Sequence, residues 1–375
     1  MLYLREIAEI IGKQLFKGKV IILFGPRRVG KTTLSKSIVS SIENSRYLNC
    51  ELLEHKTALE TTNSQELKNY LGNYSLIILD EAQHIRNIGR ILKILNDTFP
   101  EIQIIATGSS SFELGNRLAE PLTGRAREYL LLPLSITELV QKEDKITIQA
   151  NLDHILRFGL YPEVYGKSDE DAKEELIQIA SNYLYRDILQ FEQVKRPSLL
   201  QNLLTALALQ IGQEVSLNEI SRLLGETIPT IQRYIDLLEK SFVIFRLRSF
   251  SRNIRKEIGK GQKIYFYDIG IRNAIIRNFN PLQLRNDIGG LWENFCIVER
   301  MKYNLANRIF VNSYFWRTYD QKEIDYIEEE GGKINAFEFK YNQQKQPKIP
   351  AEFEKSYANT HFTSVNKENF WAFIK

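Results

Sequence analysis

Short runs of apolar, mostly β-branched residues recur in the first third of the chain, at residues 20–24, 76–79 and 102–106. A continuous apolar run of this length predicts a strand that is buried on both faces. The stretches between the runs are polar with helical spacing, and a helix is expected over residues 4–15. Strands that alternate with helices predict a parallel sheet covered by helices, which is an α/β fold.

The pattern changes after residue 135. Residues 136–212 have mainly helical spacing, including a core-facing helix expected over residues 182–189, and are interpreted as a helical lid or connector. In the next stretch, Ser216 and Glu219 form a capping-box pattern and Gly225 is placed to end the helix that follows. A second helix and a strand complete the order helix, turn, helix, strand, which is typical of a winged-helix module.

The last part of the chain has the alternating pattern of strands joined by a Gly331-Gly332 hairpin turn, and it is expected to be a separate α/β domain. Its expected strands cover residues 264–267, 314–316, 324–327 and 336–340. The chain is therefore divided into four segments, at residues 1–135, 136–212, 213–250 and 251–375.

Composition narrows the class of protein. The 375 residues are 43% apolar, enough for several cores, and the formal net charge of +4 permits a nucleic-acid partner without arguing for one. Only two cysteines and four histidines occur, without a CxxC pair, which argues against a disulfide framework or a zinc site. The early apolar run at residues 20–24 is too short for a signal core or a membrane span. A cytoplasmic protein without a membrane partner is expected.

The loop after the first strand matches the phosphate-binding pattern GxxxxGK[ST]. Its glycines let backbone N–H groups surround phosphates at the start of a helix. Lys31 is expected to reach the β- and γ-phosphates, and the Thr32 hydroxyl to coordinate Mg²⁺. The residues expected to bind ATP are Gly25, Pro26, Arg27, Arg28, Val29, Gly30, Lys31, Thr32 and Thr33. This motif predicts a P-loop ATPase core in residues 1–135.

Carboxylates at the end of the second strand complete the expected nucleotide site. Asp80 follows the apolar residues 76–79 in the Walker B arrangement and is expected to support the metal. Glu81 is placed to orient or deprotonate the attacking water, which favours hydrolysis over binding alone. At the end of the third strand, Thr107 is chosen as a contact to the γ-phosphate or the water, with an ordinary turn as the alternative.

Arg125 is the candidate for a guanidinium that stabilises charge on the transferred phosphoryl group. It lies in a glycine-containing loop after the third strand, and a solvated loop arginine is the alternative. An arginine that acted between subunits would require a homo-oligomer.

A second acidic constellation lies in the last segment. Asp325 and Glu338 are expected on neighbouring strands, with Glu293 supplied by a helix, and together they are candidate ligands of a divalent metal. Strand alternation places Lys340 beside Glu338, where it can activate water or steady a phosphate. An Asp followed by ExK is the signature of restriction-endonuclease-like folds. A solvated face or a retired site is the alternative.

The densest positive run of the chain covers residues 246–263. It contains Arg246, Arg248, Arg252, Arg255, Lys256, Lys260 and Lys263 against the single acid Glu257. With the winged-helix module before it, this run is expected to bind the phosphate backbone of DNA. A basic surface that is paired with acids elsewhere, or a module that only packs, is the alternative.

With these residues in view, the chain resembles prokaryotic AAA-type ATPases whose carboxyl-terminal part is known as domain of unknown function 4143. The resemblance extends over residues 15–345 and rests on the P-loop, on 79–83, 107–109, 122–125, 159–164, 265–270 and 291–294, and on Asp325 with Glu338 and Lys340. It implies an ATPase core, a winged-helix segment and an endonuclease-like tail. Gly159-Leu160 departs from the more usual Gly-Gly.

Two hypotheses follow. In the first, an ATP-hydrolysing, DNA-associated enzyme couples its nucleotide state to a Mg²⁺-dependent, endonuclease-like carboxyl-terminal domain. In the second, the ATPase is a regulatory switch in defence or signalling, and the winged-helix and carboxyl-terminal segments bind partners without cleaving them.

Overall fold

The computed structural model describes residues 3–109, 122–181, 196–250, 261–318, 320–342, 346–357 and 359–374. The chain forms two compact units, which are treated separately below. The amino-terminal unit comprises residues 1–134 and 240–242, and the carboxyl-terminal unit comprises residues 135–239 and 243–375. The helix expected at residues 182–189 and most of the basic run lie outside the described residues.

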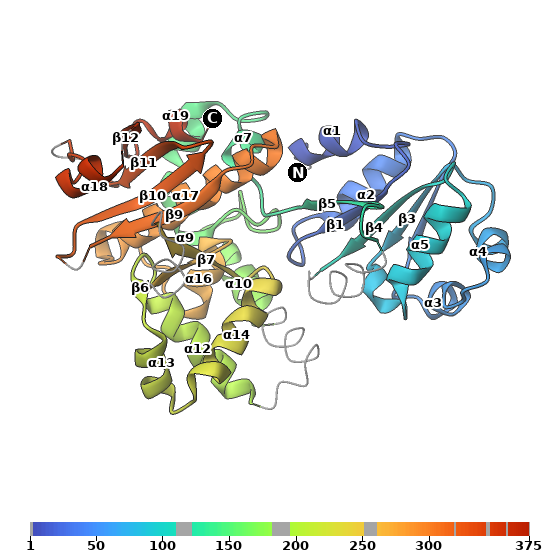
Figure 1. Cartoon of the computed structure of the whole chain (residues 1–375), viewed down its shortest axis with the longest axis horizontal. Coiled ribbons are helices and arrows are strands. Elements are labelled where there is room, and N and C mark those ends of the chain that lie inside the picture. Colours follow the sequence, from blue (N-terminus) through green and yellow to red (C-terminus); the bar gives the residue numbers. More distant parts are fainter. Residues whose placement is uncertain are drawn as a thin grey trace. The chain divides into compact units, whose positions relative to one another are not determined.

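The amino-terminal unit contains a five-stranded parallel sheet in the order β2-β3-β4-β1-β5 (Figure 1). The strands are β1 (Val20–Phe24), β2 (Ser45–Asn49), β3 (Leu76–Asp80), β4 (Gln103–Gly108) and β5 (Ala126–Leu130). The helices are α1 (Glu6–Gly12), α2 (Lys31–Ser40), α3 (Leu53–Leu59), α4 (Ser64–Leu71) and α5 (Ile88–Thr98), with a short 3₁₀ turn at Ala82–His84. This parallel sheet is the type found in P-loop NTPases.

The three strands expected from apolar runs are the three central ones, β1, β3 and β4, and every residue in them is buried. The two strands without such a run, β2 and β5, are the edges of the sheet. In β2 only Leu48 is buried, since one side of an edge strand has no neighbouring strand to cover it. An edge strand therefore carries polar residues and loses the continuous apolar signal.

The carboxyl-terminal unit has a seven-stranded mixed sheet in the order β12-β11-β10-β9-β7-β8-β6 (Figure 1). Its strands are β6 (Glu214–Val215), β7 (Ile244–Ser249), β8 (Gln262–Phe266), β9 (Asn312–Arg317), β10 (Glu323–Glu330), β11 (Lys333–Phe339) and β12 (Thr360–Val365). Its helices include α7 (Ile136–Leu139), α8 (Lys145–Ala150), α9 (Leu152–Phe158), α10 (Asp169–Ile179), α12 (Pro197–Leu209), α13 (Leu217–Leu224), α14 (Ile228–Lys240), α16 (Ile269–Ile275), α17 (Ile288–Asn307), α18 (Ala351–Ser356) and α19 (Phe370–Phe373), and a 3₁₀ turn lies at Leu282–Leu284.

The segment around α13 and α14 joins this sheet directly. Strand β8 pairs antiparallel with both β6 and β7, and β7 pairs in parallel with β9. The boundary expected at residue 250 thus runs through one continuous sheet, and the last segment is not separate at the level of strand pairing. At α13 one half of the expected capping box is present, since the Ser216 side chain accepts a hydrogen bond from the Glu219 N–H, and Gly225 ends the helix in a left-handed conformation with φ +66°.

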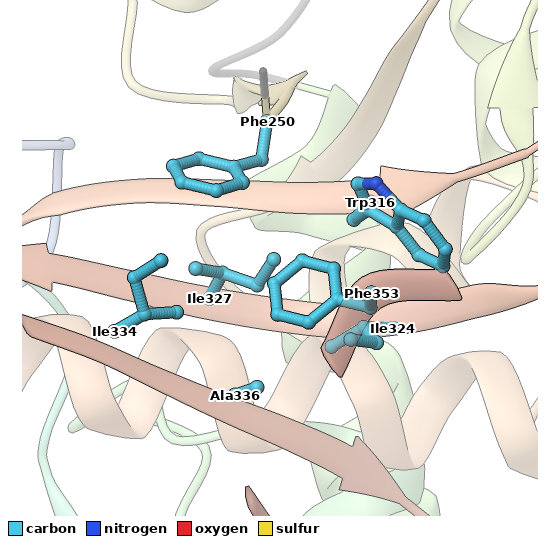
Figure 2. Close-up of a cluster of buried hydrophobic side chains, with 7 residues drawn as sticks. All are labelled: Phe250, Trp316, Ile324, Ile327, Ile334, Ala336 and Phe353. Carbon is cyan, nitrogen blue, oxygen red and sulfur yellow. The ribbon is translucent and has the colours of Figure 1, made fainter. Parts of the chain in front are cut away.

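One core of this unit lies between α18 and strands β9, β10 and β11. Figure 2 shows Phe353 of α18 among side chains contributed by all three strands, with Phe250 beside them. The buried residues of this cluster are Phe250, Trp316, Ile324, Ile327, Ile334, Ala336 and Phe353. On β11, Phe337 and Phe339 are also buried, against Tyr326 and Phe373. Both faces of β11 are therefore covered.

Two glycines of the family-like motifs allow α9 and α16 to approach closely. A Cβ on Gly159 would lie 2.2 Å from a carboxylate oxygen of Asp268, and Gly159 also has φ +73°. A Cβ on Gly270 would lie 2.1 Å from the Phe158 carbonyl oxygen. Asp268 caps α16 through the Ile271 N–H and accepts a further hydrogen bond from the Leu160 N–H. These motif residues therefore have a packing role, which leaves the chemistry to other positions.

Candidate functional site

The phosphate-binding loop joins the carboxyl end of β1 to the first turn of α2. Gly25 has φ +154°, and a Cβ there would lie 2.0 Å from the Leu131 carbonyl oxygen; Gly30 has φ +97°. Both positions therefore exclude a side chain or disfavour one. The buried Lys31 ammonium donates hydrogen bonds to the carbonyl oxygens of Gly25 and Pro26, both at 2.8 Å, and so lies over the loop.

Three side-chain hydroxyl groups donate hydrogen bonds to the Asp80 carboxylate. Its side chain is only 2% exposed, and its Oδ2 accepts hydrogen bonds from Thr32 Oγ1 at 2.8 Å and Tyr47 Oη at 2.5 Å. Its other oxygen, Oδ1, accepts a hydrogen bond from Thr107 Oγ1. The adjoining Thr32 hydroxyl and Asp80 carboxylate are oxygen donors of the kind that Mg²⁺ prefers, so these residues fit that ion.

Glu81 follows Asp80 in a left-handed conformation, φ +52°. Its N–H donates to Thr107 Oγ1 at 3.1 Å, and its Oε2 accepts a hydrogen bond from Gln83 Nε2 at 2.5 Å. The same Gln83 amide lies 3.3 Å from Ser109 Oγ. Thr107 thus connects Asp80 to the backbone of Glu81, and Gln83 fixes the Glu81 carboxylate. The expected contact of Thr107 to phosphate or water stays a prediction.

Two residues of this site were missed by sequence reasoning. Tyr47 comes from the edge strand β2, and the pKa of its hydroxyl is raised by burial and by the adjoining Asp80 carboxylate. Gln83 lies only two residues after Glu81, within the motif 79–83, and sequence reasoning gave it no role. The position of Gln83 in the sequence, directly after the Walker B acids, could have indicated that it belongs to the site. No sequence feature indicated this for Tyr47.

Arg125 is not brought to the phosphate-binding loop. Its carbonyl oxygen accepts a hydrogen bond from the N–H of Val20, the first residue of β1, whereas the loop follows the last residue of that strand. Its guanidinium pairs with Asp97 of α5 at 2.6 Å, and this pairing lowers the pKa of the carboxyl. The expectation that Arg125 stabilises phosphoryl charge therefore fails within one chain, because the residue lies at the opposite end of β1.

The second candidate site lies in the carboxyl-terminal unit. Among the described residues, one group of carboxylates can hold a metal: Glu293, Glu323 and Asp325 offer oxygen atoms within 4.8 Å of one another. Asp325 lies at a β-bulge, where the pairing of β10 with β9 shifts between Ile324 and Ile327. Bulges redirect side chains, and here Asp325 Oδ2 accepts a hydrogen bond from the Phe339 N–H at 2.8 Å.

The expected ligand set is thus changed in one member. Glu323, to which sequence reasoning gave no role, joins Glu293 and Asp325, and Glu338 is not in that group. The Glu338 carboxylate instead pairs with the Lys340 ammonium at 2.8 Å, so the expected neighbourhood of those two side chains is confirmed. Burial, and next the charge of Asp325, raise the pKa of Glu338.

Lys263 supplies a cation to this acidic cluster. The side chain is 0% exposed, its Nζ lies 2.7 Å from Glu293 Oε1, and it also pairs with Glu323. Tyr265 Oη donates a hydrogen bond to the same Glu293 oxygen. Burial and the Asp325 charge raise the pKa of Glu293 to about 8 despite the ammonium. The chemistry of the donors fits a divalent metal, but such an ion would adjoin a buried positive charge.

The described part of the basic run is largely engaged inside the protein. Lys263 belongs to the acidic cluster, and Arg246 pairs with Asp236 at 2.7 Å and with Glu239. Arg248 is exposed. The remaining members, Arg252, Arg255, Lys256 and Lys260, lie outside the described residues. Two basic residues that were counted toward DNA binding are therefore neutralised by neighbouring acids.

The sheet, the phosphate-binding loop and the Asp80–Glu81 pair are those of a P-loop ATPase core. A family model described as AAA domain matches residues 17–140, and Domain of unknown function (DUF4143) matches residues 288–369. Between them, Domain of unknown function (DUF8612) matches residues 149–282. The chain therefore carries an AAA domain followed by a DUF4143 domain.

Relatives match most of the chain, and a solved structure shares its fold. An uncharacterized protein of Mycobacterium tuberculosis is 28% identical over 340 residues, which cover 90% of this chain and 73% of that protein. One of Haemophilus influenzae is 25% identical over 355 residues, with coverages of 88% and 84%. The Walker-type ATPase PABY2304 of Pyrococcus abyssi superposes with a TM-score of 0.51 at 17% identity, covering 73% of this chain and 96% of that one, and so shares the fold. No helix among the described residues is long and apolar enough to cross a membrane.

Proposed function

We propose that the amino-terminal unit hydrolyses ATP with Mg²⁺ and that Glu81 acts on the attacking water. The backbone N–H groups of residues 25–33, apart from Pro26, and the Lys31 ammonium would hold the phosphates, while Thr32 and Asp80 would hold Mg²⁺. Mg²⁺ supplies charge neutralisation at the phosphate oxygens. The observation that carries the proposal is the contact between the Thr32 hydroxyl and the Asp80 carboxylate at 2.8 Å, beside Glu81.

Phosphate release by the full chain tests this proposal. The wild type is expected to turn over ATP only with Mg²⁺, and Thr32→Val is expected to raise the Mg²⁺ concentration for half-maximal rate roughly tenfold, since one charge-assisted contact worth about 1.5 kcal/mol is lost. Thr57→Val, at an exposed position of α3, is the matched control and should behave as the wild type. A wild-type chain that releases no more phosphate with Mg²⁺ than with EDTA overturns the proposal.

For the carboxyl-terminal unit we propose an endonuclease-like role in which nucleotide state controls cleavage of DNA. Asp325, Glu338 and Lys340 support it, with Glu293 as a further metal ligand, and the segment 213–250 with the basic run 246–263 would contact the DNA backbone. The alternative is a regulatory ATPase whose carboxyl-terminal segments only bind partners. The engagement of Lys263 and Arg246 with acids favours that alternative. A homo-oligomer and a cytoplasmic location are further proposals under either role.

Plasmid nicking separates the two roles. With Mg²⁺ or Mn²⁺ and ATP, the first role predicts nicking by the wild type, at least tenfold less by Lys340→Ala because the lysine beside Glu338 is lost, and loss of nucleotide control in Lys31→Ala. Lys333→Ala, an exposed lysine on the same strand β11, should nick as the wild type. If the wild type leaves plasmid intact under every nucleotide condition, the endonuclease role is excluded.

A further inference from the structure

Arg5 reaches the phosphate-binding loop from outside the sheet. It is the residue just before α1, and its Nη1 donates a hydrogen bond to the Val29 carbonyl oxygen at 2.6 Å. Its Nη2 donates to the Leu132 carbonyl oxygen at 2.5 Å. All three residues belong to the amino-terminal unit. One planar guanidinium therefore connects the loop to the segment that follows β5.

The contact with Val29 determines where a neighbouring N–H points. In a trans peptide group the carbonyl and the N–H of the next residue point in opposite directions. When Arg5 holds the Val29 carbonyl on its side, the Gly30 N–H is turned away from the guanidinium. Gly30, with φ +97°, has no side chain to restrict its backbone, and the Arg5 contact restricts the orientation of this peptide group.

The other end of the same loop lies against Leu131, the residue that precedes Leu132. Leu131 donates its N–H to the Phe24 carbonyl oxygen at 2.8 Å, and its own carbonyl oxygen lies against Gly25. Gly25 thus packs against Leu131, while Arg5 connects Val29 to Leu132 through two hydrogen bonds. The two ends of the loop are thus held against two adjacent residues, Leu131 and Leu132, and the guanidinium makes the connection at the Val29 end.

We propose that Arg5 is a positioning residue for the phosphates of the nucleotide: it orients the Val29–Gly30 peptide group so that the Gly30 N–H faces the phosphate. Preorganised donors bind an anion without the cost of ordering the loop on binding. The inference rests on the proposed assignment of this loop to the β- and γ-phosphates. It concerns binding, and it does not depend on whether the chain hydrolyses ATP.

Binding of fluorescent ADP and ATP analogues to the full chain tests the role of Arg5. Arg5→Ala is expected to raise Kd for both about tenfold. Arg5→Lys keeps the charge but has one nitrogen that cannot span both carbonyls, so its Kd is expected to rise at least threefold. Where the wild type hydrolyses ATP, KM should rise with Kd while kcat stays within about threefold.

Arg46→Ala is the matched control. Arg46 Nη1 also donates to backbone carbonyls in the same unit, those of Tyr70 and Leu71 at the end of α4, away from the loop. Its Kd should equal that of the wild type even if its melting temperature falls. The proposal is overturned if Arg5→Ala or Arg5→Lys binds within twofold of the wild type, or if Arg46→Ala weakens binding as much. A wild type that binds nucleotide but never hydrolyses it refutes the proposed hydrolysis alone.

Discussion

Glu81→Gln is expected to slow ATP turnover by roughly 10²–10⁴-fold, the range that a positioned general base contributes. Glutamine keeps the shape of the side chain and an oxygen that can accept the hydrogen bond from Gln83 Nε2, which now lies at 2.5 Å. It cannot take a proton from water. Binding of ATP should therefore change less than twofold while phosphate release falls, which separates the chemical step from nucleotide binding.

Single-turnover phosphate release together with ATP binding measures this difference. Glu66→Gln replaces an exposed carboxylate in the first turn of α4 of the same unit and should leave both quantities unchanged. A Glu81→Gln chain that turns over ATP within tenfold of the wild type would show that another group activates the water. Weaker ATP binding in that variant would instead show that Glu81 has a role in shaping the site.

The nucleotide site could be predicted where its residues follow one another in the sequence. The loop from Gly25 to Thr33 and the pair Asp80 and Glu81 each lie directly after a buried strand, and the carboxyl ends of parallel strands share one edge of a sheet. Tyr47 could not be predicted in this way. Its strand, β2, is an edge strand with one buried residue, so neither the strand nor its place beside Asp80 is visible in the pattern.

Arg125, by contrast, was assigned to the nucleotide site but lies away from it. It was placed near the phosphates because it follows the third predicted strand, in a loop of suitable composition. The chain, however, has already turned back there: β5 begins at the next residue, Ala126, which pairs with Val20 at the start of β1. A loop that leads into a parallel strand lies at that strand's amino end, opposite the P-loop. Because β5 is also a half-exposed edge strand, nothing in its pattern marked the turn.

In the carboxyl-terminal unit, strand alternation was sufficient for Glu338 and Lys340 but not for the acidic cluster. A bulge at Asp325 breaks the period of two, and Lys263 is contributed by a distant strand, β8. In the sequence, Lys263 ends a basic run, and such a position predicts a surface residue. Only the sheet order, which brings β8 near β9 and β10 through β7, makes it the counter-ion of Glu293 and Glu323.

Lys263→Met is expected to lower the stability of the carboxyl-terminal unit by about 3–5 kcal/mol, the usual cost of removing one partner from a buried ion pair. Methionine fills a similar volume, so packing against Phe315 is largely kept and the loss of charge dominates. All three tryptophans lie in this unit, at positions 292, 316 and 371. Urea unfolding followed by tryptophan fluorescence therefore measures the effect without a contribution from tryptophans of the other unit.

Two further variants identify the cause of that loss. Lys322→Met removes an exposed lysine paired with Glu352 and should cost less than about 1 kcal/mol, because water screens such pairs. Adding Glu293→Gln to Lys263→Met removes one of the carboxylates left without a counter-ion, and the amide can still accept the hydrogen bond from Tyr265. The double variant should therefore regain at least about 1 kcal/mol over Lys263→Met. If it is less stable instead, the packing of Lys263, and not its charge, is what the carboxyl-terminal unit requires.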